Sequence, residues 1–379
     1  MQRFLVRFSI AMFAFTLGLV THSIWSRIRL DSGLMVLCNG SDSSQDADIA
    51  PGTIPQIRSA AFVGKDQAWL VTWEKYGELW RTEDGGKTWG RLSGKAVGGV
   101  FCGISFIDSQ RGWAGNFEGQ IWHTNDGGKS WTFLSQPLGD KDHDSLTCPQ
   151  QILFVDEQNG WVIGNFSLWR TVDGGKNWTL SLSMGRVENV LWQPSHISFS
   201  GRNVGLMSAT GGIVHRTKDG GLTWHSQKLV PGESDATDAL FINERVGWLT
   251  GFVSSTEAHP GTRLYRTEDG GDSWHQVPIG DEQTYIDSVC FLNEKSGWAV
   301  GRAWKGIGDN NGVVLHSDDG GDSWREIRVG ANESYFDRMT FLDSQHGWLF
   351  GEKNIYRTAD GGKSWNTVLR VTPRRITID

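Results

Sequence analysis

The stretch Thr82-Glu83-Asp84-Gly85-Gly86-Lys87-Thr88-Trp89 decides the fold of this chain. Glycine readily adopts positive φ, and a short aspartate side chain bonds nearby backbone N–H groups, so Asp-Gly-Gly predicts a tight turn. Leu79-Trp80 before the turn and Trp89 after it are typical of buried strand positions. A single copy of this pattern predicts one β-hairpin.

The same eight-residue frame returns six more times along the chain. The copies are Thr124–Trp131, Thr171–Trp178, Thr217–Trp224, Thr267–Trp274, Ser317–Trp324 and Thr358–Trp365. The central aspartates at 84, 126, 173, 219, 269, 319 and 360 are separated by 42, 47, 46, 50, 50 and 41 residues. A period of this length indicates a repeat architecture. The frame, S/T-x-D-x-G-x-S/T-W, is the Asp box or BNR repeat, and only Asn177 in the third box departs from it.

Each repeat predicts four antiparallel strands. An apolar strand ending in Phe, such as Ile104-Ser105-Phe106, precedes a strand that usually begins Gly-Trp, such as Gly112-Trp113. A third strand leads into the Asp box, and the fourth begins at the box tryptophan. Because one such sheet cannot bury its apolar face alone, neighbouring repeats must stack. The chain is therefore predicted to be all-β, with a seven-bladed β-propeller of four-stranded blades over 53–372 and a tail at 373–379. No strand exchange is evident, so ring closure is expected to rest on packing of the first blade against the last.

The amino end predicts export. Arg3 precedes and Arg7 enters an apolar run within residues 4–25, which is the pattern of a signal peptide or membrane anchor over 1–28. Cleavage and retention both remain open. Residues 29–52 are predicted to be a flexible linker, because the segment 39–52 is polar and acidic.

Composition excludes several function classes. The net charge is −7 and the pI is about 5.8, whereas a nucleic-acid surface needs a basic stripe. The four cysteines have no CxxC spacing, so no metal, redox motif or cofactor is predicted. Cys102 and Cys148 precede the first-strand Phe of neighbouring blades and form a possible disulfide in an exported protein.

The seven box aspartates are interpreted as structural. A turn in every blade needs its own cap, and seven copies around a ring cannot converge on one substrate. The residues are Asp84, Asp126, Asp173, Asp219, Asp269, Asp319 and Asp360.

Binding is expected at the opposite face, where the second-to-third-strand and blade-to-blade connections emerge. Long loops on a rigid scaffold commonly carry function, and tryptophans outside the repeat pattern favour a protein interface. The alternative is that these aromatic residues only pack the loops down. The candidates are Trp73, Tyr76, Trp192, His196, His259, Trp304, Lys305, Tyr335 and Arg338.

The central channel is expected to be lined by residues that precede each first-strand Phe. They are Arg58, Gln150, His196, Asp238, Asp287, Asp337 and Arg338. His196 and Asp238 lie on adjacent blades, where they form either a structural hydrogen bond or a general base with its orienting group.

The strings Gly297-Trp298-Ala299-Val300-Gly301 and Leu315–Trp324 resemble the photosystem II stability and assembly factor family, and similar strings run from Phe62 to Trp365. The resemblance implies a non-catalytic, monomeric propeller exported to the thylakoid lumen or periplasm. It also implies a protein partner, such as newly made reaction-centre subunits, and no cofactor. Arg58, Arg302 and Arg338 are scattered matches to the family's basic binding patch.

Two other functions compete with this one. Sialidases and some endoglucanases also carry Asp boxes, and Asp238, Asp287 and Asp337 on successive blades could provide the two carboxylates of a glycosidase. A sialidase Phe-Arg-Ile-Pro string is absent, and the chain has only 5 tyrosines from which to draw a nucleophile. Carbohydrate binding without turnover, on exposed tryptophans, is the third possibility.

Overall fold

The computed structural model describes residues 53–72, 77–92, 99–137, 149–184, 186–187, 190–191, 193–230, 234–253, 261–280, 284–304, 310–330 and 333–371. All of them belong to the compact unit Ile49–Asp379. The predicted signal or anchor at 1–28, the linker at 29–52 and the tail at 373–379 lie outside the described residues. Within the described ranges, no helix is long and apolar enough to cross a membrane.

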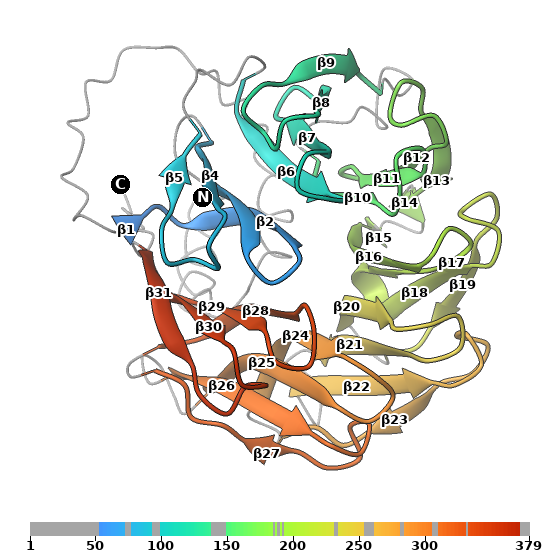
Figure 1. Ribbon diagram of the computed structural model, residues 1–379. Coiled ribbons are helices and arrows are strands. Elements are labelled where there is room, and N and C mark those ends of the chain that lie inside the picture. Colours follow the sequence, from blue (N-terminus) through green and yellow to red (C-terminus); the bar gives the residue numbers. More distant parts are fainter. Residues whose placement is uncertain are drawn as a thin grey trace, which may run out of the picture. The chain divides into compact units, whose positions relative to one another are not determined.

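The described residues form seven successive antiparallel sheets, which follow one another around a ring (Figure 1). Blade 1 contains β2 (Ile57–Val63), β3 (Gln67–Thr72), β4 (Leu79–Thr82) and β5 (Gly90–Arg91). Blade 2 contains β6 (Phe101–Phe106), β7 (Gly112–Asn116), β8 (Ile121–Thr124) and β9 (Thr132–Ser135). Blade 3 contains β10 (Gln151–Phe154), β11 (Gly160–Ile163), β12 (Ser167–Thr171) and β13 (Thr179–Ser183).

Blades 4 to 7 repeat the same order of strands. Blade 4 contains β16 (Pro194–Ser200), β17 (Val204–Ala209), β18 (Ile213–Thr217) and β19 (His225–Lys228). Blade 5 contains β20 (Ser234–Phe241), β21 (Gly247–Val253), β22 (Gly261–Thr267) and β23 (His275–Val277). Blade 6 contains β24 (Thr284–Phe291), β25 (Gly297–Trp304), β26 (Asn310–Ser317) and β27 (Arg325–Glu326). Blade 7 contains β28 (Phe336–Phe341), β29 (Gly347–Gly351), β30 (Asn354–Thr358) and β31 (Asn366–Val371). The predicted seven-bladed propeller is confirmed.

Four short elements lie outside this repeat. The strands β14 (Arg186–Val187) and β15 (Val190–Leu191) form a hairpin between blades 3 and 4. A single 3-10 turn, η1 (Thr210–Gly212), connects β17 to β18. The strand β1 (Thr53–Ile54) precedes blade 1 and belongs to the sheet of blade 7.

Every Asp box has the same hydrogen bonds. In the first, Thr82 Oγ1 donates to Asp84 Oδ1 at 2.9 Å, and the Thr88 N–H and hydroxyl donate to the two carboxylate oxygens at 2.9 and 2.6 Å. Gly85 and Gly86 have φ of 71° and 84°, the region that glycine tolerates. In the third box Asn177 Nδ2 donates to Asp173 Oδ2 at 2.7 Å, so the amide replaces the usual hydroxyl.

Adjacent blades are joined by a stacked pair of aromatic rings. The second-strand tryptophan of one blade lies flat on the first-strand phenylalanine of the next, as Trp113 does on Phe154 with ring centroids 3.8 Å apart. The Trp113 indole N–H also donates to the carbonyl of Gly174, in the Asp box of blade 3, at 2.9 Å. In blade 4 Leu206 replaces the tryptophan and is fully buried. These contacts bury the repeating core between blades rather than within them.

Ring closure differs from the expectation that packing alone would hold blade 7 to blade 1. β1 runs parallel to β31, with Thr53 opposite Arg370 and Ile54 opposite Val371. Ile54 is 1% exposed and packs in a cluster that contains core residues of both blades. The strand therefore adds hydrogen bonds and buried apolar surface at the closure. The aromatic pair there, Trp348 and Phe62, is less closely stacked than Trp113 and Phe154, because its rings are tilted by 38° with centroids 5.5 Å apart.

Candidate functional site

The two ends of the blades have different roles. The N–H of Gly85 in the first Asp box donates to the carbonyl of Asp66 in the β2–β3 turn at 2.8 Å, and Gly127 and Gln110 repeat this contact in blade 2. The boxes and the first turns thus share one end, which we call the box face. The opposite end, where second-to-third-strand and blade-to-blade connections emerge, is the loop face.

The innermost strands carry a recurring β-bulge near the loop face. In six blades one residue has no opposite partner on the second strand, because the register shifts there by one. These residues are Arg58, Cys102, Ser195, Thr237, Asp287 and Asp337. A bulge leaves one residue outside the ladder and redirects its side chain. Sequence patterns do not reveal one extra residue, so this feature was missed.

Side chains bridge the innermost strands of successive blades. Ser59 Oγ accepts from the Ile104 N–H at 3.2 Å, and Ser105 Oγ accepts from the Phe154 N–H at 3.0 Å. Ser198 Oγ likewise accepts from the Phe241 N–H at 3.2 Å. These bonds occupy edge-strand N–H groups that would otherwise be available for pairing with other chains.

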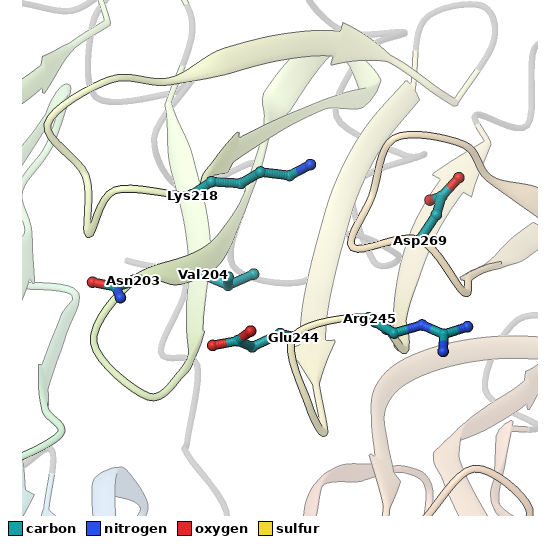
Figure 2. Close-up of a pocket in the computed structure, with 6 residues that line it drawn as sticks. All are labelled: Asn203, Val204, Lys218, Glu244, Arg245 and Asp269. Carbon is teal, nitrogen blue, oxygen red and sulfur yellow. The ribbon is translucent and has the colours of Figure 1, made fainter.

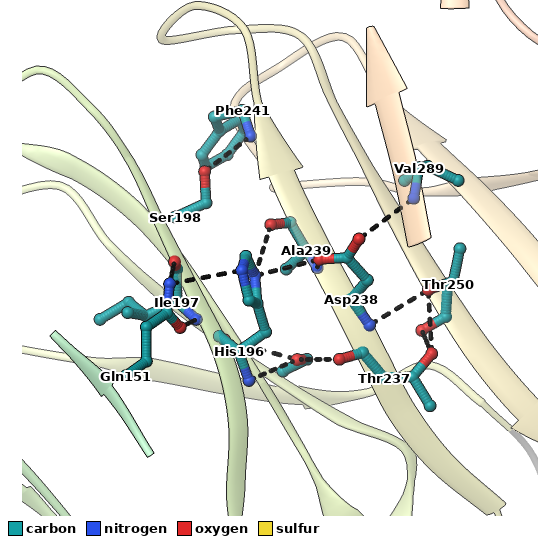
Figure 3. Close-up of polar contacts among 11 residues, drawn as sticks. Gln151, His196, Ile197, Ser198, Thr237, Asp238, Ala239, Phe241, Thr250 and Val289 are labelled. Atoms are coloured by element: carbon teal, nitrogen blue, oxygen red, sulfur yellow. Dashed lines mark hydrogen bonds and ion pairs between the residues drawn. The ribbon is translucent and has the colours of Figure 1, made fainter. Parts of the chain in front are cut away.

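His196 and Asp238 belong to this ring of bridges (Figure 3). His196 Nδ1 lies 3.0 Å from Asp238 Oδ1, and the N–H of Val289 on blade 6 donates to Asp238 Oδ2 at 3.1 Å. Gln151 bonds the backbone of Ile197 through both its amide atoms, which orients its Nε2 to donate to His196 Nε2 at 3.3 Å. The remaining proton of a neutral imidazole then lies on Nδ1 and points to Asp238. With both ring nitrogens engaged, the geometry is that of a structural link across blades 3 to 6.

A second polar cluster lies where blades 6 and 7 meet at the loop face. Asp287 on β24 lies 3.8 Å from the guanidinium of Arg302 on β25, its Oδ2 accepts no hydrogen bond, and its side chain is 18% exposed. Burial, together with the charge of Asp337 on blade 7, raises the pKa of Asp287 to about 7, although Arg302 acts in the opposite direction. Burial and the nearby carboxylates of Asp337, Glu352 and Asp287 raise the pKa of Tyr335 to about 12.

Aromatic side chains flank the same face. Phe117, in the β7–β8 connection, is 44% exposed, and the guanidinium of Arg58 from blade 1 lies 4.5 Å from its ring centroid. On blades 5 and 6, Phe252 and Tyr285 have ring centroids 5.5 Å apart. Phenylalanine and arginine are both enriched in protein interfaces, and a guanidinium over an aromatic ring is a favourable contact. Phe117 was missed because nothing in the repeat pattern distinguishes it.

The predicted loop-face residues divide into two groups. His196, Tyr335 and Arg338 are described, and Arg338 is exposed beside the Asp337 bulge. Trp73, Tyr76, Trp192, His259 and Lys305 lie outside the described residues, as does the side chain of Trp304. Cys102 is buried, and its predicted partner Cys148 also lies outside the described part. Among the described residues, no group of three or more His, Cys, Asp or Glu could hold a metal ion.

The box face has a shallow cavity between blades 4 and 5, with a volume of about 400 Å³ (Figure 2). Asn203, Val204 and Lys218 line it from blade 4, and Glu244, Arg245 and Asp269 line it from blade 5. Lys218 Nζ donates to Asp272 at 2.8 Å, and Arg245 Nε donates to the Glu268 carbonyl at 3.3 Å. Lys218 and Arg245 are thus engaged with the Asp box of blade 5.

Comparison with known proteins relates both the sequence and the fold to one group. Residues 95–230 match the family model of the photosynthesis system II assembly factor YCF48. The structure of YCF48 bound to D1 peptide is similar with a TM-score of 0.59 and 21% identity, covering 81% of this chain and 94% of that one. YCF48 from Cyanidioschyzon merolae gives a TM-score of 0.59 and 18% identity, covering 81% and 96%.

A glycoside hydrolase shares the architecture more loosely. The GH74 xyloglucanase from Xanthomonas campestris gives a TM-score of 0.50 and 12% identity, covering 82% of this chain and 72% of that one. At such identities the likeness to solved structures shows the fold. No curated protein sequence matches the chain.

Proposed function

We propose that this chain, a propeller similar to the photosystem II assembly factors in sequence motif and in fold, is a non-catalytic scaffold that binds a polypeptide partner on its loop face. The observation that carries the proposal is the division of labour between the two faces. The polar groups of the Asp boxes and of their neighbours form hydrogen bonds with one another. On the loop face, by contrast, Phe117, Arg338 and the bulged residue Asp337 are exposed to solvent. These groups are needed to distinguish one function from another, because a propeller fold hosts many activities.

The partner class follows from the similar proteins. One of them is described with a D1 peptide, so a segment of a membrane protein under assembly is the first ligand to consider. The predicted export signal or anchor at 4–25 would place the propeller outside the cytoplasm, in the periplasm or thylakoid lumen. Trp73, Trp192 and Trp304 remain proposed contacts on the same face. We further propose that the chain acts as a monomer and needs no cofactor.

One of the three candidate carboxylates of the glycosidase alternative, that of Asp238, is already engaged. Such hydrolysis needs two available carboxyl groups about 5–9.5 Å apart. Asp238 is 9% exposed and bonds His196 and the Val289 N–H, so its oxygens are already occupied. Release of reducing sugar from xyloglucan would revive this alternative.

The proposal is tested by measuring binding of a fluorescent D1 peptide to the purified protein. Phe117→Ala removes an exposed aromatic group from the loop face and is expected to weaken binding by roughly fivefold or more, the effect of losing an interface hot spot. Leu222→Ala is the matched control, because Leu222 is 68% exposed on the box face. Weaker binding by the control, with Phe117→Ala unchanged, would place the partner on the wrong face for this proposal.

A further inference from the structure

One boundary between blades lacks an ion pair that the same repeat positions form at another boundary. Between blades 2 and 3, the guanidinium of Arg111 forms an ion pair with Glu157. Arg111 directly precedes Gly112, which lies opposite Phe106, and Glu157 is the third residue after Phe154. This ion pair lies on the box face and joins the first turn of blade 2 to the first turn of blade 3.

Between blades 4 and 5, the equivalent positions are occupied by Val204 and Glu244. Val204 directly precedes Gly205, which lies opposite Phe199, and Glu244 is the third residue after Phe241. Both residues line the cavity of about 400 Å³ in Figure 2. The acidic member of the pair is thus retained, whereas a short apolar side chain replaces the arginine. The cavity therefore lies where an arginine side chain crosses the boundary between blades 2 and 3.

Three of the charged groups that line the cavity already have partners in the Asp box of blade 5. Lys218 Nζ forms an ion pair with Asp272 Oδ2 at 2.8 Å. The carboxylate of Asp269 accepts hydrogen bonds from the Ser273 N–H at 2.9 Å and from the Ser273 hydroxyl at 2.6 Å. Arg245 donates from Nε to a backbone carbonyl of the same box at 3.3 Å. These contacts leave the carboxylate of the fourth charged residue, Glu244, to be accounted for.

The carboxylate of Glu244 is available to a ligand. It is exposed, and no described residue forms a hydrogen bond or an ion pair with it. Figure 2 shows it turned toward Asn203 and Val204, whereas the guanidinium of Arg245 points the other way. The side-chain amide of Asn203 is also exposed and without a partner among the described residues, and its oxygen can accept a hydrogen bond. The cavity thus presents one carboxylate and one amide beside an apolar side chain.

We propose that this cavity binds the guanidinium of an arginine side chain from a protein partner, with Glu244 as the opposing anion. A guanidinium can donate two parallel hydrogen bonds to one carboxylate, and its remaining N–H groups can donate to the amide oxygen of Asn203. The methylene stem packs on Val204, because arginine stems cover apolar surface well. Lysine, which presents a point charge, matches a planar carboxylate less well. The site is on the box face and is therefore separate from the loop-face binding proposed above.

A polypeptide is a better occupant than a free guanidinium compound. Arg111 is held by a second carboxylate, since its Nε donates to Asp108 Oδ2 at 2.6 Å, but blade 4 has Gly201 at the equivalent position. A Cβ at Gly201 would have no heavy atom within 4 Å, so the structure supplies no substitute there. A single exposed ion pair contributes little to binding. The molecule that carries the guanidinium must then provide further contacts, which a peptide backbone can do.

The site is tested by titrating an acetylated, amidated pentapeptide, Ala-Ala-Arg-Ala-Ala, into the full-length protein while backbone amides are followed by NMR. Saturable shifts are expected at residues 201–204 and 243–246. The same peptide with citrulline in place of arginine keeps the shape and lacks the charge, so it should bind about threefold to fivefold more weakly, the upper range for an exposed ion pair. Absence of shifts at these residues, or equal affinity for the two peptides, overturns the proposal.

Two variants assign the charge recognition to one carboxylate. Glu244→Gln keeps the shape of the side chain and should weaken binding of the arginine peptide to the level of the citrulline peptide. Glu157→Gln is the matched control, because Glu157 has the same place in its repeat and is already paired with Arg111. The control should leave the affinity unchanged. Unchanged affinity in Glu244→Gln, or an equal loss in both variants, contradicts the assignment.

A third variant fills the cavity from within the chain. Val204→Arg restores the residue pair of blades 2 and 3 and should abolish the shifts at 243–246, whereas retained affinity in a folded Val204→Arg protein excludes this site. Val204 is buried, so urea unfolding is measured first, and Glu244→Gln decides the matter where Val204→Arg does not fold. N-acetylarginine amide identifies the source of the guanidinium. It should bind several-fold more weakly than the pentapeptide, and equal or tighter binding overturns the protein partner.

Discussion

Replacing Ile54 with alanine tests how the ring is closed. Ile54 is the second residue of β1, is 1% exposed, and packs beside Trp348, Leu369 and Val371 of blade 7 and Leu70 of blade 1. Truncating a buried isoleucine to alanine costs about 2–5 kcal/mol, the sum of lost transfer free energy and of the cavity left behind. If β1 were undocked, the same change would alter the free energy of unfolding by no more than about 0.5 kcal/mol, as at other surface positions.

The assay is urea unfolding followed by tryptophan fluorescence, which the 20 tryptophans make sensitive. The midpoint of Ile54→Ala should fall with an unchanged slope, because the surface exposed on unfolding is nearly the same. Val172→Ala, at a side chain that is 54% exposed, provides the control for a loss of methyl groups without a cavity. Faster hydrogen exchange in β31 and β2 should accompany the loss, since both border the closure. Equal unfolding free energies for Ile54→Ala and the control would refute the closure by β1.

Two further predictions concern the Asp boxes. Hydrogen bonds, foremost from the Thr88 side chain, lower the pKa of Asp84 to about 2, so its contribution is present above the ordinary value near 3.9 and is lost as pH falls toward 2. Asp84→Asn should therefore show a shallower fall in urea midpoint between pH 5 and pH 2.5, and parallel curves would contradict this. Gly221→Ala should destabilise by about 1–3 kcal/mol, because φ is +89° and a Cβ would lie 2.9 Å from Ser181 Oγ and 3.1 Å from Trp161 Nε1. Gly64→Ala, with φ of +56° and open space around it, should cost only about 1 kcal/mol in thermal or urea unfolding, and an equal cost at both positions would exclude the steric argument.

Sequence reasoning located the blades because each repeat carries local signals. Glycines at 85 and 86 have the positive φ that the turn requires, and the box aspartate bonds residues only two to four positions away. The first strands that end in Phe and the second strands that begin Gly-Trp are likewise recognised from strand period and hydrophobicity. Such interactions depend on neighbours in the chain, so they can be predicted without knowing the fold.

The candidate site was predicted less completely. Position along the innermost strands identified His196, Asp238, Asp287 and Asp337 as candidates. It could not show that Asp287 and Asp337 lie at a β-bulge, whereas Asp238 lies one residue beyond the bulge of its strand. Nor could it show that Asp238 receives donors from His196 and from two backbone N–H groups, while Asp287 Oδ2 receives none within hydrogen-bonding distance. Phe117 has no signal of its own, and its significance comes from the arginine of blade 1 that lies beside it.

The sequence by itself determined the number of blades, the strand order within each and the turn chemistry, because these depend on short-range periodicity and capping. The tertiary structure decided how the ring closes, since β1 has two residues and pairs with a strand more than three hundred positions away. It also decided the surroundings of Asp287 at the junction of blades 6 and 7. A carboxyl group's proton affinity depends on burial and on charges from other blades, and neither is encoded in the residues next to it.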